Sequence, residues 1–161
     1  MSEFTLKIDY SNYFHDYSDI VSYLLSLKGI EDVIVKEEEK TGLINVITKY
    51  KSENISNERI KLEILGFLNL LNNPAVYGFD KHYKGKDIQC INLHYNICCE
   101  FCYANILDIL YNTKGIEKVE SDFCEKYLDV DSQYTISIYY NPKVISENEM
   151  QDLKKEIDVY G

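Results

Sequence analysis

Apolar and polar residues alternate along the start of the chain. The apolar positions of this alternation are Phe4, Leu6, Ile8 and Tyr10. A period of two is typical of a strand that buries one face. The alternation returns at residues 89–95, where Ile91, Leu93 and Tyr95 share one side. Both segments therefore predict strands.

Apolar residues at helical spacing follow each of these strands. The positions that would share one helix face are Tyr17, Ile20, Leu24 and Leu27, and later Tyr103, Ile106, Leu107 and Leu110. Such spacing is typical of an amphipathic helix. Gly29 and Gly115 then stand where a helix often ends in a left-handed cap. The sequence thus predicts two amphipathic helices that each end at a glycine.

The segments after these glycines predict two further strands in each half of the chain, because they are rich in β-branched and aromatic residues. These strands are expected at residues 32–37, 43–50, 118–123 and 134–140. Ser56 and Ser146 are then positioned as helix N-caps, and Glu149 completes a capping box with Ser146. These helices are expected to run to about Leu71 and Ile157. Residues 75–83 are expected to add one more strand, after Pro74 interrupts the preceding helix.

The two halves of the chain repeat one another. The residues that coincide are Tyr17 with Tyr103, Lys28–Glu31 with Lys114–Glu117, Tyr50 with Tyr140, and Ile55-Ser56 with Ile145-Ser146. All of these matches are identical residues, and they keep their order along the chain. They indicate that one run of elements, β-α-β-β-α, occurs twice.

This repeat predicts an α+β fold of two tandem ferredoxin-like units, in which the full element order is β-α-β-β-α-β. The expected domains are residues 1–84, which lack a cysteine motif, and residues 85–161, which carry one. The second unit lacks its last strand in this sequence, and a three-stranded sheet exposes an edge that can recruit another strand. Residues 75–83 could supply the closing strand of the first unit. Alternatively, they serve the second unit, or the open edge of the second unit pairs with a protein partner or a second copy.

Composition narrows the functional classes. The chain has 27 acidic residues against 17 basic ones, which argues against a nucleic-acid binder because phosphate contacts need clustered Lys and Arg. No apolar run approaches the roughly 20 residues of a membrane span, and no secretion signal is visible at the N-terminus. No Ser-His-Asp arrangement or phosphate-binding glycine loop indicates an enzyme. We therefore expect a cytoplasmic protein that is not an enzyme, binds no nucleic acid and does not insert into membranes.

The second half carries a cysteine motif in a family context. The relevant segments are Ile97-Cys98-Cys99-Glu100-Phe101-Cys102, then Gly115-Ile116, then Tyr140-Asn141-Pro142-Lys143-Val144-Ile145-Ser146. In their order and spacing, residues 88–157 resemble the heavy-metal-associated domain, the unit of copper chaperones and of the N-termini of metal-pumping ATPases. That family places a Met-x-Cys-x-x-Cys motif between its first strand and first helix. The resemblance implies a ferredoxin-like fold and a metal site at Cys99 and Cys102.

Departures from the family pattern shape the expected site. Ile97 replaces the family's Met, as an apolar residue that can anchor the loop to the core. Cys98 is an additional thiol and becomes an optional third ligand. In the first half of the chain, Tyr13 and Asp16 fall where Cys99 and Cys102 would be. Any metal role is therefore expected of the second half alone.

Two cysteines separated by two residues at the start of a helix can direct both sulfurs at one point. The helix N-terminus favours the thiolate, the form that binds metal ions. Paired thiolates suit Cu(I), and a third ligand such as Cys98 would favour Zn(II) or a similar ion. The sequence therefore predicts a small metal-binding protein that transfers or senses Cu(I) or Zn(II) through Cys99 and Cys102.

Two other interpretations stay open. The chain could be a protein-interaction module with a vestigial metal site, whose acidic, tyrosine-rich surface contacts a partner. The two cysteines could instead exchange thiols and disulfides, although the sequence lacks a thioredoxin context. Among the other candidate ligands, Cys90 and His94 lie on the outward side of their predicted strand, and Cys124 is expected to be a packing residue.

Overall fold

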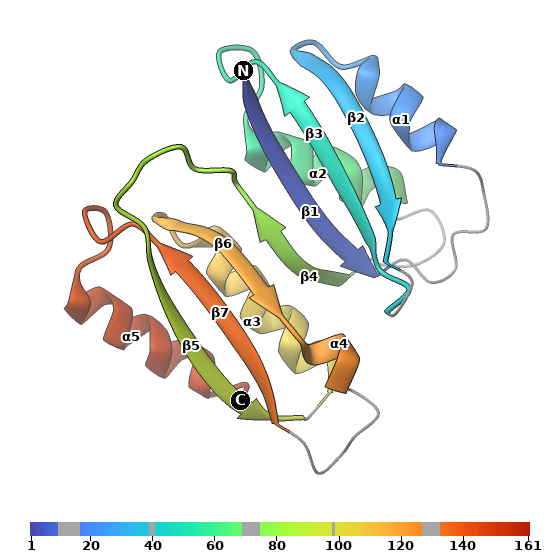
Figure 1. The fold of residues 1–161 in the computed structure, drawn as a ribbon. Coiled ribbons are helices and arrows are strands. Elements are labelled where there is room, and N and C mark those ends of the chain that lie inside the picture. Colours follow the sequence, from blue (N-terminus) through green and yellow to red (C-terminus); the bar gives the residue numbers. More distant parts are fainter. Residues whose placement is uncertain (10–16, 39–40, 69–74, 98, 127–132) are drawn as a thin grey trace. The chain divides into compact units, whose positions relative to one another are not determined.

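The computed structural model describes residues 1–9, 17–38, 41–68, 75–97, 99–126 and 133–161. The chain divides into two units, Met1–Val76 and Tyr77–Gly161. Helices and strands follow one another along both units, as Figure 1 shows, and every strand pair described within them is antiparallel.

Three strands and two helices form most of the first unit. These elements are β1 (Ser2–Asp9), α1 (Ser18–Leu25), β2 (Ile30–Glu37), β3 (Ile44–Tyr50) and α2 (Asn57–Leu68). β3 lies between β1 and β2 and pairs with both. The alternating pattern of the first strand is confirmed, because Phe4, Leu6 and Ile8 are completely buried.

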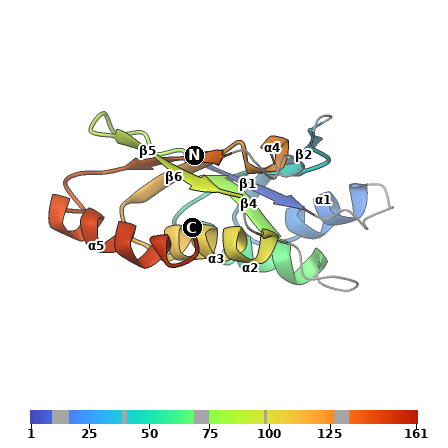
Figure 2. The ribbon, with the colours of Figure 1, turned by 90° about the horizontal axis from the view of Figure 1, so that it is seen from below.

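The second unit repeats this arrangement, with one strand between two others. Its elements are β4 (Ala75–Asp80, which begins at the end of the first unit), β5 (Gln89–Asn96), α3 (Glu100–Asn112), β6 (Ile116–Ser121), the short α4 (Phe123–Lys126), β7 (Gln133–Tyr140) and α5 (Glu147–Asp158). β7 pairs with both β5 and β6. Figure 2 shows α3 and α5 on the same face of these strands. The predicted capping box of Ser146 and Glu149 is confirmed at the start of α5.

Two glycines confirm the predicted helix ends and show how closely the units repeat. Gly29 and Gly115 both have a φ of 98°. A Cβ at either position would lie 2.7 Å from a neighbouring side chain, that of Asn54 in the first unit and that of Ile145 in the second. Only glycine suits such a conformation and such a close approach. The match of Lys28–Glu31 with Lys114–Glu117 in the sequence therefore corresponds to one turn built twice.

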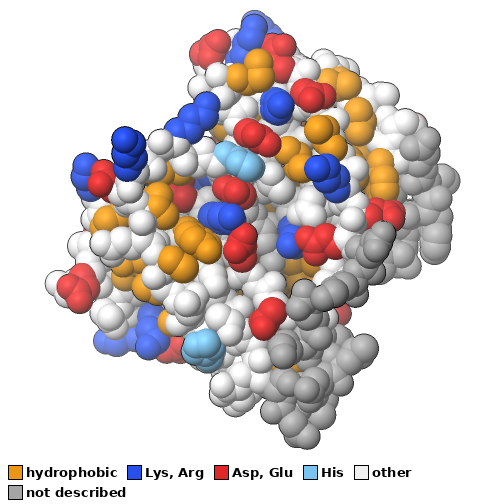
Figure 3. Space-filling model, in the orientation of Figure 1, with side chains coloured by type: hydrophobic (Ala, Val, Ile, Leu, Met, Phe, Trp, Pro, Cys, Tyr) orange, Lys and Arg blue, Asp and Glu red, His pale blue; other side chains and the backbone are white. Residues whose placement is uncertain are grey.

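Acidic and basic side chains are interspersed on the face drawn in Figure 3. Ion pairs among the described residues include Lys7 with Glu38 at 2.6 Å and Lys143 with Asp87 at 2.7 Å. On this face the described basic side chains do not gather into a single patch, the arrangement that phosphate binding requires.

The prediction of two tandem ferredoxin-like units is wrong. The described strands form one seven-stranded sheet in the order β2-β3-β1-β4-β6-β7-β5, whereas two such units would each have a four-stranded sheet of their own. The strand expected at residues 75–83 is β4, and it serves the second unit. There Phe79 pairs with Val119 and Asp80 with Lys118, both on β6.

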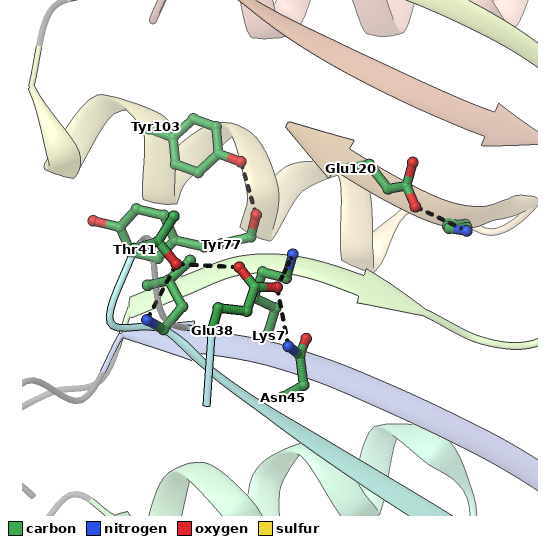
Figure 4. A network of polar contacts seen from close by, with 9 residues as sticks. Lys7, Glu38, Thr41, Asn45, Tyr77, Tyr103 and Glu120 are labelled. Carbon is green, nitrogen blue, oxygen red and sulfur yellow. Dashed lines mark hydrogen bonds and ion pairs between the residues drawn. The ribbon is translucent and has the colours of Figure 1, made fainter. Parts of the chain in front are cut away.

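Aromatic side chains explain why β4 joins the second unit. Tyr77 and Phe79 of β4 are both 3% exposed. The ring of Tyr77 lies 5.2 Å from that of Tyr103, and the ring of Phe79 meets that of Tyr111 edge-on at 5.1 Å. The Tyr103 hydroxyl also donates a hydrogen bond to the Tyr77 carbonyl at 2.7 Å (Figure 4). A sequence repeat identifies the elements but not the edge that a strand will join, so this pairing could not be predicted.

Candidate metal centre

The two principal cysteines of the predicted site lie between β5 and α3. Cys99 is the N-cap of α3, with an extended backbone of φ −142° and ψ 159°, and its sulfur accepts a hydrogen bond from the Cys102 N–H at 3.4 Å. Ser, Thr, Asp or Asn usually fills this position, because a side-chain acceptor satisfies one of the N–H groups that a helix start leaves unbonded. In this chain a sulfur does so.

The sulfurs of Cys99 and Cys102 lie 3.3 Å apart. Both side chains are half-buried, and both residues are thiols, since a disulfide bond would bring the sulfurs to about 2.05 Å. The positive end of the helix dipole favours the thiolate form at this place. The structure therefore brings two sulfurs together at a helix N-terminus.

Apolar side chains flank the pair in the sequence. Ile97, the predicted anchor of the loop, is half-buried. Phe101, which stands between the two cysteines, is 75% exposed. Cys98, the optional third ligand, lies outside the described residues. The described site therefore has two thiols and an exposed aromatic ring in the same helical turn.

An aromatic cluster fixes the first turn of α3, and sequence reasoning missed it. Tyr103 follows Cys102 directly, is 1% exposed, and stacks on Phe123 at a centroid distance of 4.3 Å. Tyr134 meets these two rings edge-on at 5.6 and 4.9 Å. Burial raises the pKa of the Tyr103 hydroxyl well above its ordinary value, so the group stays protonated and donates to the Tyr77 carbonyl. The feature of the sequence that could have indicated this aromatic cluster is its content of 15 tyrosines.

The other candidate ligands are not part of this pair. His94 and Cys90 are exposed on β5, where His94 Nδ1 lies 3.0 Å from the Thr135 hydroxyl and Cys90 contacts the Asn92 side chain. Cys124 is half-buried in α4. In the part of the chain that the structure describes, no group of three or more His, Cys, Asp or Glu side chains is placed to hold a metal ion. The candidate centre therefore consists of the Cys99 and Cys102 sulfurs.

Comparison of the sequence with protein-family models finds no match, and comparison with curated proteins finds no matching relative. None of the described helices combines the length and the apolar character that crossing a membrane requires. The resemblance to the heavy-metal-associated domain thus stays a prediction from the sequence. A function for the cysteine pair has to be argued from its geometry.

Proposed function

We propose that the second unit holds one thiophilic metal ion through Cys99 and Cys102, and that Cu(I) is the preferred ion. The observation that supports this function is the 3.3 Å separation of the two sulfurs at the N-terminus of α3. Two sulfurs that each bind one ion at about 2.3 Å lie no more than about 4.6 Å apart. Both sulfurs are therefore within reach of a single ion.

The number of thiols favours Cu(I) over Zn(II). Two thiolates satisfy Cu(I), whereas structural Zn(II) sites take four ligands. Cys99 and Cys102 supply two, so Zn(II) would need further ligands, such as Cys98 or groups from another molecule. A near-linear Cu(I) site requires the two sulfurs to move about 1 Å farther apart than they are in this structure. Rotation of the cysteine side chains between staggered conformers supplies this movement.

The exposure of the site supports exchange of the ion, as transfer or sensing requires. Both cysteines are half-buried, while Glu100 and Phe101 between them are exposed. A thiol of another molecule can therefore approach the bound ion. The cytoplasm, where thiols stay reduced, is the location that suits this chemistry. The first unit has no cysteine in its sequence, and it serves this proposal as a structural or docking module.

Anaerobic titration of the reduced full chain against a competing chelator tests the proposal, with Cu(I) and Zn(II) in separate experiments. We expect about one Cu(I) per chain and weaker binding of Zn(II). The variant Cys99→Ser/Cys102→Ser should lose this binding, and serine at position 99 keeps a side-chain acceptor for the helix cap. The matched control Cys90→Ser/Cys124→Ser removes two thiols outside the pair and should bind Cu(I) like the unaltered chain.

Three results are possible besides the expected one. Equal Cu(I) binding by the Cys99→Ser/Cys102→Ser variant would overturn the proposal, because the ion would then lie elsewhere. Absence of Cu(I) binding by the unaltered chain would also overturn it and favour the protein-interaction module. A chain that binds no ion but forms a reversible Cys99–Cys102 disulfide would favour thiol exchange instead.

A further inference from the structure

The geometry of the cysteine pair suits a disulfide bond as well as a metal ion. The Cys99 thiol donates a hydrogen bond to the Cys102 sulfur, and the two sulfurs lie 3.3 Å apart. The sulfurs of a disulfide lie about 2.05 Å apart, so the pair has to close by only about 1 Å. Both residues belong to the first turn of α3, which keeps their side chains on adjacent positions of one helix end. The pair can therefore form a disulfide within its own turn.

The pair is also open to a small molecule in solution. Cys99 and Cys102 are half-buried, whereas Glu100 and Phe101 between them are exposed, Phe101 by 75%. A thiol takes part in thiol–disulfide exchange only where the reacting disulfide can reach its sulfur. This access is the same that exchange of a metal ion requires, so the two reactions compete for the same two sulfurs.

We propose that a disulfide bond between Cys99 and Cys102 switches the metal centre off, and that glutathione disulfide is the oxidant. This inference rests on the metal binding proposed above. One cysteine thiolate attacks a sulfur of glutathione disulfide, forms a mixed disulfide and releases one glutathione. The other cysteine thiolate then attacks the cysteine sulfur of the mixed disulfide and releases the second glutathione. The chain loses two electrons and two protons, and both pass to the two glutathione thiols that are formed.

Disulfide formation and metal binding exclude one another at this pair. Thiolates bind metal ions, and the joined, neutral sulfurs of a disulfide have lost that charge. A bound ion in turn occupies the two sulfurs that would attack the oxidant. Because the coupling between two equilibria is reciprocal, the ion protects the dithiol by the same factor by which oxidation weakens binding of the ion.

The start of α3 makes this disulfide readily reversible. In the reduced chain the Cys99 sulfur accepts the Cys102 N–H hydrogen bond, at the positive end of the helix dipole. Both interactions are stronger for a thiolate than for a neutral disulfide sulfur. Such stabilisation of the reduced form makes a disulfide easier to reduce. Glutathione thiol therefore restores the pair, and the metal centre follows the ratio of glutathione to its disulfide.

Mass spectrometry of the metal-free chain tests the disulfide by itself. The full-length variant Cys90→Ser/Cys98→Ser/Cys124→Ser retains only the pair. With glutathione disulfide it should lose two hydrogen atoms and retain no glutathione, and an excess of glutathione thiol should reverse this change. Adding Cys99→Ser or Cys102→Ser gives the matched controls. Each should retain one glutathione as a mixed disulfide, because no second thiol is left to displace it. A pair that does not close, or a disulfide that glutathione thiol does not reduce, would overturn the proposal.

Anaerobic Cu(I) titration against a competing chelator tests the switch on the same variant. The dithiol form should bind about one Cu(I) per chain and the disulfide form none. With free Cu(I) held at about 100 times its dissociation constant, the ratio of disulfide to dithiol at a fixed glutathione ratio should fall about 100-fold. Equal Cu(I) binding by both forms, or an unchanged ratio, would overturn the switch.

The two proposals fail in different ways. A dithiol form that binds no Cu(I) would overturn the metal centre and, with it, the switch. A chain that binds Cu(I) through Cys99 and Cys102 but forms no disulfide would overturn the switch alone.

Discussion

Cys99 serves both the fold and the candidate metal centre. Its sulfur caps α3 by accepting the Cys102 N–H hydrogen bond, and it lies 3.3 Å from the Cys102 sulfur. A charged acceptor makes a stronger hydrogen bond than a neutral one, so the thiolate that binds a metal ion is also the better helix cap. Serine at this position separates the two roles, since it preserves the cap and removes the soft ligand.

Glu38 is a second residue whose surroundings have a measurable consequence. Its carboxylate pairs with Lys7 at 2.6 Å and accepts hydrogen bonds from the Asn45 amide at 3.0 Å and the Thr41 hydroxyl at 3.1 Å (Figure 4). Burial by itself raises the pKa of Glu38. The hydrogen bonds from Asn45 and Lys7 and the charge of Lys7 outweigh burial, so the pKa lies below its ordinary value of 4.5.

The lowered pKa of Glu38 predicts a pH-dependent contribution to stability. The ionised carboxylate stabilises the folded chain above about pH 4.5, and this contribution disappears as the pH falls through the lowered pKa. We expect Glu38→Gln to lower the free energy of unfolding at neutral pH, with a difference from the unaltered chain that shrinks in acid. Urea unfolding at a series of pH values measures this difference. The exposed Glu53→Gln control should show little change, and a pH-independent loss in Glu38→Gln would contradict the account.

At the scale of elements, the repeat determines the turns and the aromatic cluster determines where β4 pairs. Gly29 and Gly115 close the same turn in the two units with the same φ of 98°. β4 has no such counterpart in the second unit, and its side chains pack on Tyr103 and Tyr111 of α3. Local structure therefore follows the repeated sequence, while the order of strands follows side-chain packing.

A glycine substitution in the turn at Gly115, compared with a control substitution inside α2, tests whether this turn requires glycine. Gly115→Ala adds a Cβ only 2.7 Å from the Ile145 side chain and strains a positive φ, so we expect a loss of about 1–3 kcal/mol in the free energy of unfolding. Gly66→Ala lies inside α2, where no atom is within 4 Å of the added Cβ, and should stabilise the chain by about 0.5–1 kcal/mol. Urea unfolding of both variants measures these changes. Equal effects of the two substitutions would show that the turn does not require glycine.

The success of the sequence predictions depended on how local each feature is. The helix around Ile20 and Leu24 was predicted from periodicity, because one buried face imposes a regular pattern. The strands around Val46 and Ile136 were predicted from their β-branched and aromatic residues, which favour extended backbone. The four-residue α4 was missed, since it is too short to show a helical period. The pairing of β4 with β6 could not be predicted, because it depends on aromatic residues brought together by the fold.

At the scale of the whole molecule, two similar units carry different chemistry. All five cysteines belong to the second unit. This division is visible in the sequence, because it depends only on residue identity. The placement of Cys99 and Cys102 at a helix start is visible there as well. The 3.3 Å separation of their sulfurs and the packing of Phe123 and Tyr134 against the first turn of α3 could not be predicted from the sequence, since they depend on contacts between distant segments. The chain therefore combines one scaffold, built twice, with one candidate metal centre.

X-ray absorption at the copper edge tests the central claim most directly. The Cu(I)-loaded Cys90→Ser/Cys124→Ser chain retains Cys98, Cys99 and Cys102 and removes the two other thiols. We predict that the copper has sulfur ligands only, two in number, and that Cys99→Ser/Cys102→Ser gives no such spectrum. A copper ion with nitrogen or oxygen ligands, or a chain that retains no copper after desalting, would contradict the proposal that Cys99 and Cys102 form a metal centre.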